Sequence, residues 1–177
     1  MTWIHKQHMK TKLYLIIVIF VLAANLNGQQ SSPWSKLSWM IGEWKGLGSG
    51  EPGKSSGVFA FKPDLDGKIL VRKAHSDYPA TADRPAFVHD DLLIVYLGVS
   101  GNPSKAIYFD NEGHTINYSI SYADKNIVFL SDKIPNLPVF RLTYTQIDGE
   151  TVNVKFEMSQ DGQKFMTYVE GKCKKTK

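Results

Sequence analysis

The chain has 177 residues, with 21 lysine and arginine residues against 17 aspartate and glutamate residues and a formal net charge of +4. A single cysteine, Cys173, excludes an intrachain disulfide, so packing alone must hold the fold together. The basic face interleaved with aromatic residues that marks nucleic-acid-binding proteins is missing, so no nucleic-acid partner is expected. The basic residues cluster only in the C-terminal Lys172, Lys174, Lys175 and Lys177.

The N-terminal segment has the features of a secretory signal peptide. Lys6, Lys10 and Lys12 precede an apolar run over 13–24, and small and polar residues follow as far as Gly28. The run is shorter than the ~20 residues that span a bilayer, although an uncleaved anchor is an alternative. We predict a signal peptide over 1–28 and a single exported domain over 29–177, periplasmic or secreted, with no stable membrane insertion after cleavage. Removal of three lysines leaves a net charge of +1.

A helical turn and a glycine-rich strand open the predicted domain. Trp34, Leu37 and Ile41 have helical spacing, which predicts one or two turns that cover one end of a barrel. In the next segment Trp44 alternates with small residues. These are Gly42, Gly46, Gly48 and Gly50. Glycine in a strand permits a sharp bend or close backbone approach, so we expect the first strand of a small barrel, plugged by Trp44.

The rest of the chain consists of short alternating segments separated by turn signals such as Asp148-Gly149 and Asp161-Gly162. Period-two alternation is clearest over 114–122 and 151–158, which indicates one buried and one solvated face. With no long helical segment or crossover, we predict an all-β fold, an antiparallel up-and-down barrel of about ten strands with a short N-terminal helical plug. The predicted strands are 42–49, 56–62, 68–75, 92–98, 104–110, 114–122, 126–131, 139–146, 151–158 and 164–173.

One connection, 76–91, is too long for a hairpin turn and contains several aromatic residues. Loops of this length in compact domains are often binding loops. We expect it to form a flap over the barrel mouth.

The stretch 37–48, Leu-Ser-Trp-Met-Ile-Gly-Glu-Trp-Lys-Gly-Leu-Gly, resembles the opening of the calycin-like barrels, which include lipocalins, fatty-acid-binding proteins and nitrobindin-like proteins. Their first strand carries Gly-x-Trp-x-Gly-x-Gly after a short helical turn. The run 106–114 is similar to a hairpin of uncharacterised bacterial lipocalin-like proteins. The resemblance implies a lipocalin-like β-barrel with a ligand pocket over 29–177.

Nitrobindins hold haem through a histidine near the C-terminus, whereas the last histidine here is His114. The resemblance therefore carries no haem ligand to this chain, and we expect no cofactor. A metal site is an alternative, because several nitrogen and oxygen ligands lie near loop ends, but their spacing matches no recognised metal motif and no metal is expected. These residues are His75, His89, Asp90, Asp91, Asp110, Glu112 and His114.

A polar patch is predicted near one barrel rim. His114 and Tyr118 share the apolar face of segment 114–122. If the preceding turn is a type I turn with a bulge, Tyr108 and Asp110 join that face; with a four-residue loop, Phe109 joins it instead. The sequence leaves both registers open. The patch is either a binding site or a structural tyrosine cluster.

Two arginines, Arg72 and Arg141, fall within predicted strands. A buried arginine needs a partner, because an unpaired buried charge is costly. Either one can grip a ligand carboxylate with parallel hydrogen bonds, which is similar to the way fatty-acid-binding proteins hold a lipid head group. The alternative is a cation stacked on Trp44 that seals the barrel floor, a role that suits Arg141 better.

We therefore predict an exported protein that holds a small apolar or amphipathic ligand in a barrel cavity. The expected ligand-binding residues are Arg72, Tyr108, His114, Tyr118 and Arg141. One alternative is a barrel enzyme in which His114 or His89 performs acid–base chemistry; another is a ligand-free interaction module with a filled core. The chain carries no nucleophile elbow, phosphate loop or dinucleotide fingerprint, so an enzyme is the less favoured reading. Ligand identity and oligomeric state are left open.

Overall fold

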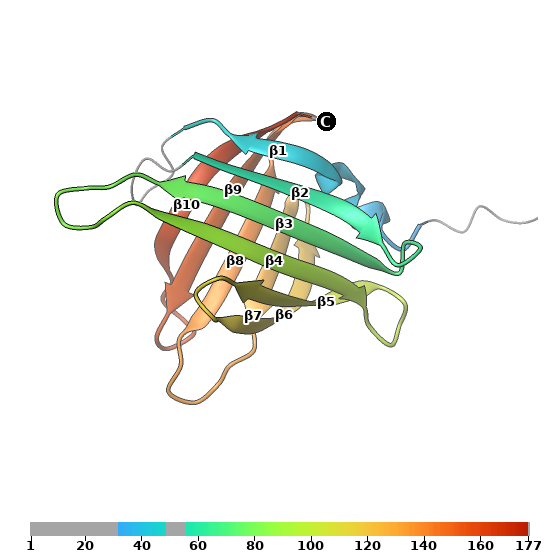
Figure 1. Ribbon diagram of the computed structural model, residues 1–177. Helices are drawn as coiled ribbons and strands as arrows, with labels where there is room; N and C mark the ends of the chain where they lie inside the picture. The colour runs from blue at the N-terminus through green and yellow to red at the C-terminus, as the bar shows by residue number, and fades with distance from the viewer. Residues whose placement is uncertain (1–31, 49–55, 177) are drawn as a thin grey trace, which may run out of the picture. The chain divides into compact units, whose positions relative to one another are not determined.

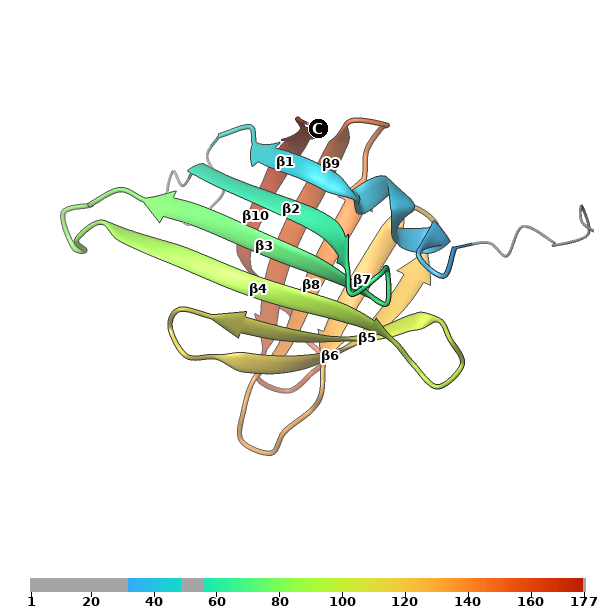
Figure 2. The same ribbon diagram turned by 45° about the vertical axis from the view of Figure 1, so that its right-hand side comes forward.

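We describe residues 32–48 and 56–176 of a computed structural model; the predicted signal peptide and Gly50 lie outside the described residues. Within that part of the chain, ten strands form a closed antiparallel barrel (Figures 1 and 2). Each strand pairs with its neighbours in sequence, and β1 (Gly42–Gly46) closes the barrel against β10 (Met166–Lys175). The prediction of an all-β, ten-stranded up-and-down barrel is confirmed. No helix within these residues is long and apolar enough to cross a bilayer.

The strand boundaries agree with the predicted ranges to within three residues, except that β4 begins five residues earlier than expected. The agreement follows from the turn residues, which fix where each strand must stop. The remaining elements are η1 (Ser35–Met40), β2 (Ser56–Asp64), β3 (Ile69–Tyr78), β4 (Phe87–Leu97), β5 (Pro103–Asp110), β6 (Thr115–Ala123), β7 (Asn126–Ser131), β8 (Val139–Gln146) and β9 (Thr151–Ser159).

The predicted helical plug is the 3₁₀ helix η1, which covers one end of the barrel. Trp34, Leu37 and Met40 are buried, whereas Ile41 is only half-buried. A 3₁₀ helix has three residues per turn, so the buried stripe runs 34, 37, 40 rather than ending at 41 as predicted. The Trp34 indole donates a 2.7 Å hydrogen bond to the carbonyl of Gly67, in the β2–β3 turn. This contact ties the plug to the barrel wall.

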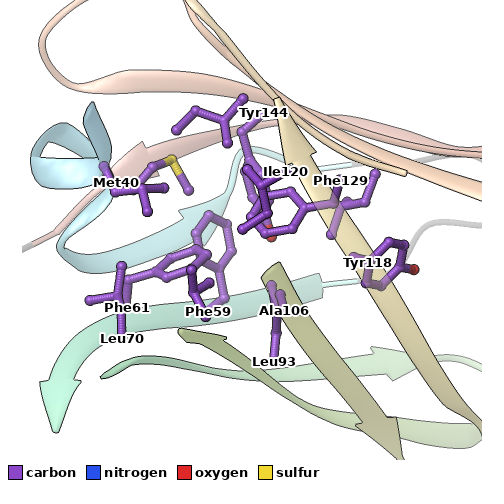
Figure 3. Packing of buried hydrophobic residues seen from close by; sticks show 14 of the residues in the cluster. Met40, Phe59, Phe61, Leu70, Leu93, Ala106, Tyr118, Ile120, Phe129 and Tyr144 are labelled. Carbon is purple, nitrogen blue, oxygen red and sulfur yellow. The ribbon is translucent and has the colours of Figure 1, made fainter. Parts of the chain in front are cut away.

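Trp44 lies in the core directly behind the plug. Its indole N–H donates to the Met40 carbonyl at 2.8 Å, and its ring stacks on Phe59 at a centroid distance of 6.0 Å. The cation over the Trp44 ring is the Lys175 ammonium, 5.3 Å from the centroid. Around them the buried side chains of most strands pack against one another (Figure 3). We call this packed half of the interior the floor.

The predicted flap is in large part paired strand, and that prediction is wrong. β3 continues to Tyr78 and β4 begins at Phe87, so the connection shrinks to 79–86. The Tyr78 and Phe87 rings stack face to face at 4.4 Å, and the Arg84 guanidinium lies 4.2 Å from the Phe87 centroid. Figures 1 and 2 both show this hairpin extending beyond the ends of the neighbouring strands rather than folding over the barrel.

Candidate functional site

The end of the barrel opposite η1 is open. In an up-and-down barrel alternate connections share one end, so the β3–β4, β5–β6, β7–β8 and β9–β10 connections surround this opening. Several inward-facing residues close to it are half-buried: Tyr108, Ile116, Phe140, Val154 and Phe156. Their partial exposure means that solvent enters the barrel here. We call this region the mouth.

A groove of about 710 Å³ lies along the outer face of β1 to β5. Most of its lining residues, such as Val58, Lys73, His75 and Leu92, point away from the barrel interior. None of the half-buried mouth residues named above lines it. The groove is therefore a feature of the outer surface and is separate from the mouth.

Arg72 of β3 is the polar centre of the interior. Its Nη2 donates to Asp91 Oδ1 of β4, and its Nη1 donates to the Tyr144 hydroxyl of β8. The side chains of Arg72 and Asp91 are both at least nine-tenths buried. The two counter-partners raise the pKa of Arg72 above its ordinary value, although burial alone would lower it, so the guanidinium keeps its proton.

One donor of this guanidinium is unused. Arg72 Nε is buried and has no hydrogen-bond partner, and it is the only such side-chain nitrogen or oxygen within residues 32–48 and 56–176. An unsatisfied buried donor costs about 1–3 kcal/mol, so native structures rarely keep one without a reason. Arg72 Nε–H is therefore a buried donor whose acceptor the described protein groups do not supply.

The β5–β6 hairpin adopts the bulged register, one of the two alternatives left open by the sequence. Tyr108 pairs with Ile116, and Gly113 has a φ of 91°. Asp110 accepts a 2.9 Å hydrogen bond from the His114 backbone N–H, and its Oδ2 lies 2.8 Å from His114 Nδ1. Burial raises the pKa of Asp110, but these hydrogen bonds outweigh it and lower the pKa below its ordinary value. Asp110 is thus ionised at neutral pH.

His89 of β4 connects this hairpin to the interior. Its Nδ1 lies 2.9 Å from Glu112 Oε1 and its Nε2 lies 3.0 Å from the Tyr108 hydroxyl, which donates to Asp110 Oδ2 at 3.3 Å. Burial, and then the charge of Asp91, raise the pKa of Tyr108 well above its ordinary value. We call the chain of Glu112, His89, Tyr108, Asp110 and His114 the rim network.

The structure brings the rim network close to Arg72 through Asp91, whose Oδ2 lies 3.8 Å from His89 Nε2. Of the predicted ligand-binding residues, Arg72, Tyr108 and His114 therefore belong to one continuous polar site, with Tyr118 beside it. Burial raises the pKa of Tyr118 and the charge of Arg72 lowers it, with a net rise. Figure 3 shows the Tyr118 hydroxyl pointing away from the packed cluster.

Arg141 does not face the interior, and the structure does not bring it together with the other predicted ligand-binding residues. It alternates with the inward-facing Leu142 and lies on the outer face of β8. Its Nε donates to Glu157 at 2.7 Å, and its guanidinium lies 3.9 Å from the Phe165 ring centroid. The expected contact with Trp44 is made by Lys175 instead.

Sequence reasoning missed Asp91 and Tyr144 as partners of Arg72, and placed His89 in a loop. A usable signal was present: His89, Asp91, Leu93 and Val95 alternate with period two and share one face of β4. The described residues contain no group of three or more histidine, cysteine or acidic side chains arranged to hold a metal ion.

The architecture is that of a ten-stranded antiparallel barrel with one plugged end and a polar site at the other. No protein-family model and no curated protein matches the chain. Among solved structures, the barrel is similar to the crystal structure of Rv2717c from M. tuberculosis, with a TM-score of 0.57 and 14% sequence identity over 83% of this chain and 99% of that one. At this identity the match supports the barrel fold, and membership of the calycins remains a resemblance.

Proposed function

We propose that this protein binds a small amphipathic molecule in the mouth of the barrel. The observation that carries the proposal is the buried Arg72 guanidinium with a vacant donor at Nε. The guanidinium lies between the packed floor and the mouth. A ligand that enters through the mouth would place its polar group there. A binding function needs apolar surface beside a few convergent polar groups, and the half-buried apolar residues of the mouth together with Arg72 supply both.

The apolar part of the ligand would lie against the half-buried residues of the mouth. Phe140 and Phe156 stack on each other at 5.7 Å, with ring planes 10° apart, and Ile116 and Val154 also face inward. Covering such surface contributes about 25 cal/mol per Å² of apolar area removed from water. A ligand chain that covers these side chains would therefore gain more binding free energy than one on a polar surface.

A fluorescence titration with Nile red, a neutral solvatochromic dye, tests the proposal. We expect saturable binding with a blue-shifted emission, weakened at least tenfold in the double variant F140A/F156A. Leu130→Ala, which removes an exposed apolar side chain of β7, is the matched control and should bind like the wild type. A lack of saturable binding by the folded wild-type protein would refute the proposal.

We also propose that the protein is exported, on the strength of the signal-like sequence over 1–28. Mass spectrometry of the protein recovered from its source should give a chain that begins at Gln29. Recovery of the full-length chain from the membrane fraction would contradict export by cleavage.

Acid–base catalysis is a second candidate, and the rim network specifically favours it. The network joins two histidines and two carboxylates through the Tyr108 hydroxyl at the opening. A positioned imidazole of this kind can move a proton on a bound substrate. The protein would then speed deuterium exchange at the α-carbons of a long-chain methyl ketone in D₂O, and His89→Asn would abolish the effect. Exchange at the uncatalysed rate would eliminate this candidate.

A further inference from the structure

Two polar groups of the site have a hydrogen-bond donor without a partner within the described residues. Arg72 Nε–H is a donor only and has no partner. Tyr118, whose pKa the charge of Arg72 influences, keeps its hydroxyl proton because burial raises that pKa, and no hydrogen bond of that hydroxyl occurs within the described residues. A group that reaches Arg72 Nε–H must accept a hydrogen bond, which a carbonyl oxygen does with its two lone pairs, and the Tyr118 hydroxyl can donate a second.

The charge of Arg72 is already balanced. Asp91 bonds it directly, and both side chains are buried. Asp110 stands opposite Asp91 across the β4–β5 ladder, and its lowered pKa keeps it ionised. The basic side chains of the rim network are also paired, His89 with Glu112 and His114 with Asp110. An incoming carboxylate would therefore meet a guanidinium that already has a counter-ion, and the negative charge of Asp110.

We infer that the ligand's polar group is an uncharged hydrogen-bond acceptor, such as the carbonyl of an amide, ketone or ester, carried on an apolar chain. The inference rests on the proposed binding function and narrows it. It replaces the sequence-based expectation that Arg72 takes an acidic group, because that expectation assumed an arginine without a protein counter-ion. A ligand ammonium group is disfavoured because it cannot accept a hydrogen bond from Arg72 Nε–H.

Competition against Nile red with three ligands of equal chain length tests the inference. The ligands are dodecanamide, dodecanoate and dodecylammonium, each at pH 7.5 and below its aggregation threshold. We expect dodecanamide to bind at least tenfold more tightly than either charged ligand. Dodecanoate that binds as tightly as dodecanamide, or more tightly, would overturn the inference.

Asp91→Asn provides the decisive variant, because it removes one charge and preserves the shape of the side chain. We expect dodecanoate to gain at least tenfold in affinity while dodecanamide changes less than threefold. The matched control is Glu157→Gln, which alters a buried carboxylate that also pairs with an arginine, but on the outer face. An unchanged preference in Asp91→Asn would overturn the inference.

Two further results separate the possible failures. If Asp91→Asn does not fold, Tyr118→Phe replaces it; we expect that variant to weaken dodecanamide at least fivefold and to weaken dodecylammonium less, and equal effects on both would overturn the inference. If Nile red and all three ligands fail to bind the folded wild type, the proposed function itself fails. If the three ligands bind with equal affinity, the proposed function stands and only the inference fails.

Discussion

Arg72 is held inside the barrel by side chains from two other strands, Asp91 of β4 and Tyr144 of β8. Tyr144 is 72 residues from Arg72 in the sequence, so that hydrogen bond forms only when β8 joins the barrel, whereas Asp91 lies 19 residues away on the adjacent strand β4. Buried ion pairs add little net stability compared with apolar packing, but removing one member leaves the other charged and buried. The pair therefore makes the interior sensitive to single substitutions.

We predict that Arg72→Met lowers the free energy of unfolding by about 3–5 kcal/mol, because Asp91 is left without its counter-ion. The double variant R72M/D91L should recover most of this loss, since it replaces both charges with apolar groups. Urea unfolding measures each value. As a control, Lys62→Met breaks an exposed ion pair with Glu43 and should cost no more than about 1 kcal/mol. Equal stability of R72M and the wild type would show that the ion pair is solvated and not buried.

At this scale the sequence predicted residue types better than partners. Polar groups on the buried face of an alternating strand need a partner, and this criterion identified Arg72, Tyr108, His114 and Tyr118. Their partners depend on register across β4, which no local pattern specifies, since a shift of one residue exchanges the two faces. Arg141 shows the same limit: its neighbours in sequence do not tell which face it takes.

Among the elements, the β9–β10 hairpin shows how a turn is fixed by one side chain. Asp161 Oδ1 accepts hydrogen bonds from the backbone N–H groups of Gln163 and Lys164, at 2.8 and 2.9 Å, and from the Ser159 hydroxyl at 2.8 Å. These bonds lower the pKa of Asp161 to about 2. The turn signal Asp161-Gly162 was readable in the sequence for this reason: the carboxylate substitutes for missing backbone acceptors.

Asp161 gives a pH-dependent prediction. Because its pKa is lower in the folded than in the unfolded chain, its stabilising effect is complete above about pH 4 and is lost as the pH falls toward 2. The difference in urea midpoint between the wild type and Asp161→Asn should therefore be constant from pH 5 to 7 and shrink between pH 4 and 2. A difference that does not change with pH would contradict the role of the carboxylate.

The β3–β4 hairpin gives a second prediction at this scale. Tyr78 and Phe87 are directly opposite each other and stacked, at the far end of the two strands. An aromatic pair of this kind contributes about 0.5–1.5 kcal/mol beyond its buried area. Phe87→Ala should speed amide hydrogen exchange over 76–78 and 87–89 with little change in global stability, whereas Val88→Ala, an exposed neighbour, should not. Unchanged exchange in Phe87→Ala would mean that backbone pairing alone holds the hairpin.

The strands themselves could be predicted because turn residues bound them, whereas the 76–91 segment could not. Its strand ends are polar and carry few β-branched residues, so they look like a loop until the cross-strand aromatic pair is seen. The 3₁₀ geometry of η1 was likewise hidden, since spacing of three and four residues both fit a short helical segment.

The two ends of the barrel differ in the side chains that they carry. η1 and Trp44 fill the floor, and the half-buried aromatic residues and the rim network surround the mouth. This asymmetry depends on the closure of the barrel, because Trp44 of β1 pairs with Lys175 of β10, near opposite ends of the domain. Closure was predictable from the run of hairpins, but the seam was not, because it joins the segments most distant in sequence.

The seam can be tested with the chain's own cysteine. Gly46 pairs with Cys173 across β1 and β10, and the flanking hydrogen bond from Leu47 N–H to the Lys172 carbonyl makes this a non-hydrogen-bonded pair, the closer type. A Cβ added at Gly46 meets only ordinary contacts, 3.4 Å at the nearest. Gly46→Cys should therefore place two thiols within disulfide reach.

We predict that Gly46→Cys forms an intramolecular disulfide when treated at pH 8 with diamide, the oxidant that takes up the two electrons lost by the thiols; the reaction should be slow because burial raises the pKa of the Cys173 thiol to about 11. The bond closes a loop of more than a hundred residues, for which chain entropy predicts a stabilisation of about 4–5 kcal/mol. Leu47→Cys is the control, because that exposed side chain points to the opposite face and should remain unlinked. Mass spectrometry and non-reducing electrophoresis distinguish the two variants. Equal linkage in both, or none in Gly46→Cys, would mean that β1 and β10 do not meet in this register, and the asymmetric interior that depends on their pairing would have to be rebuilt.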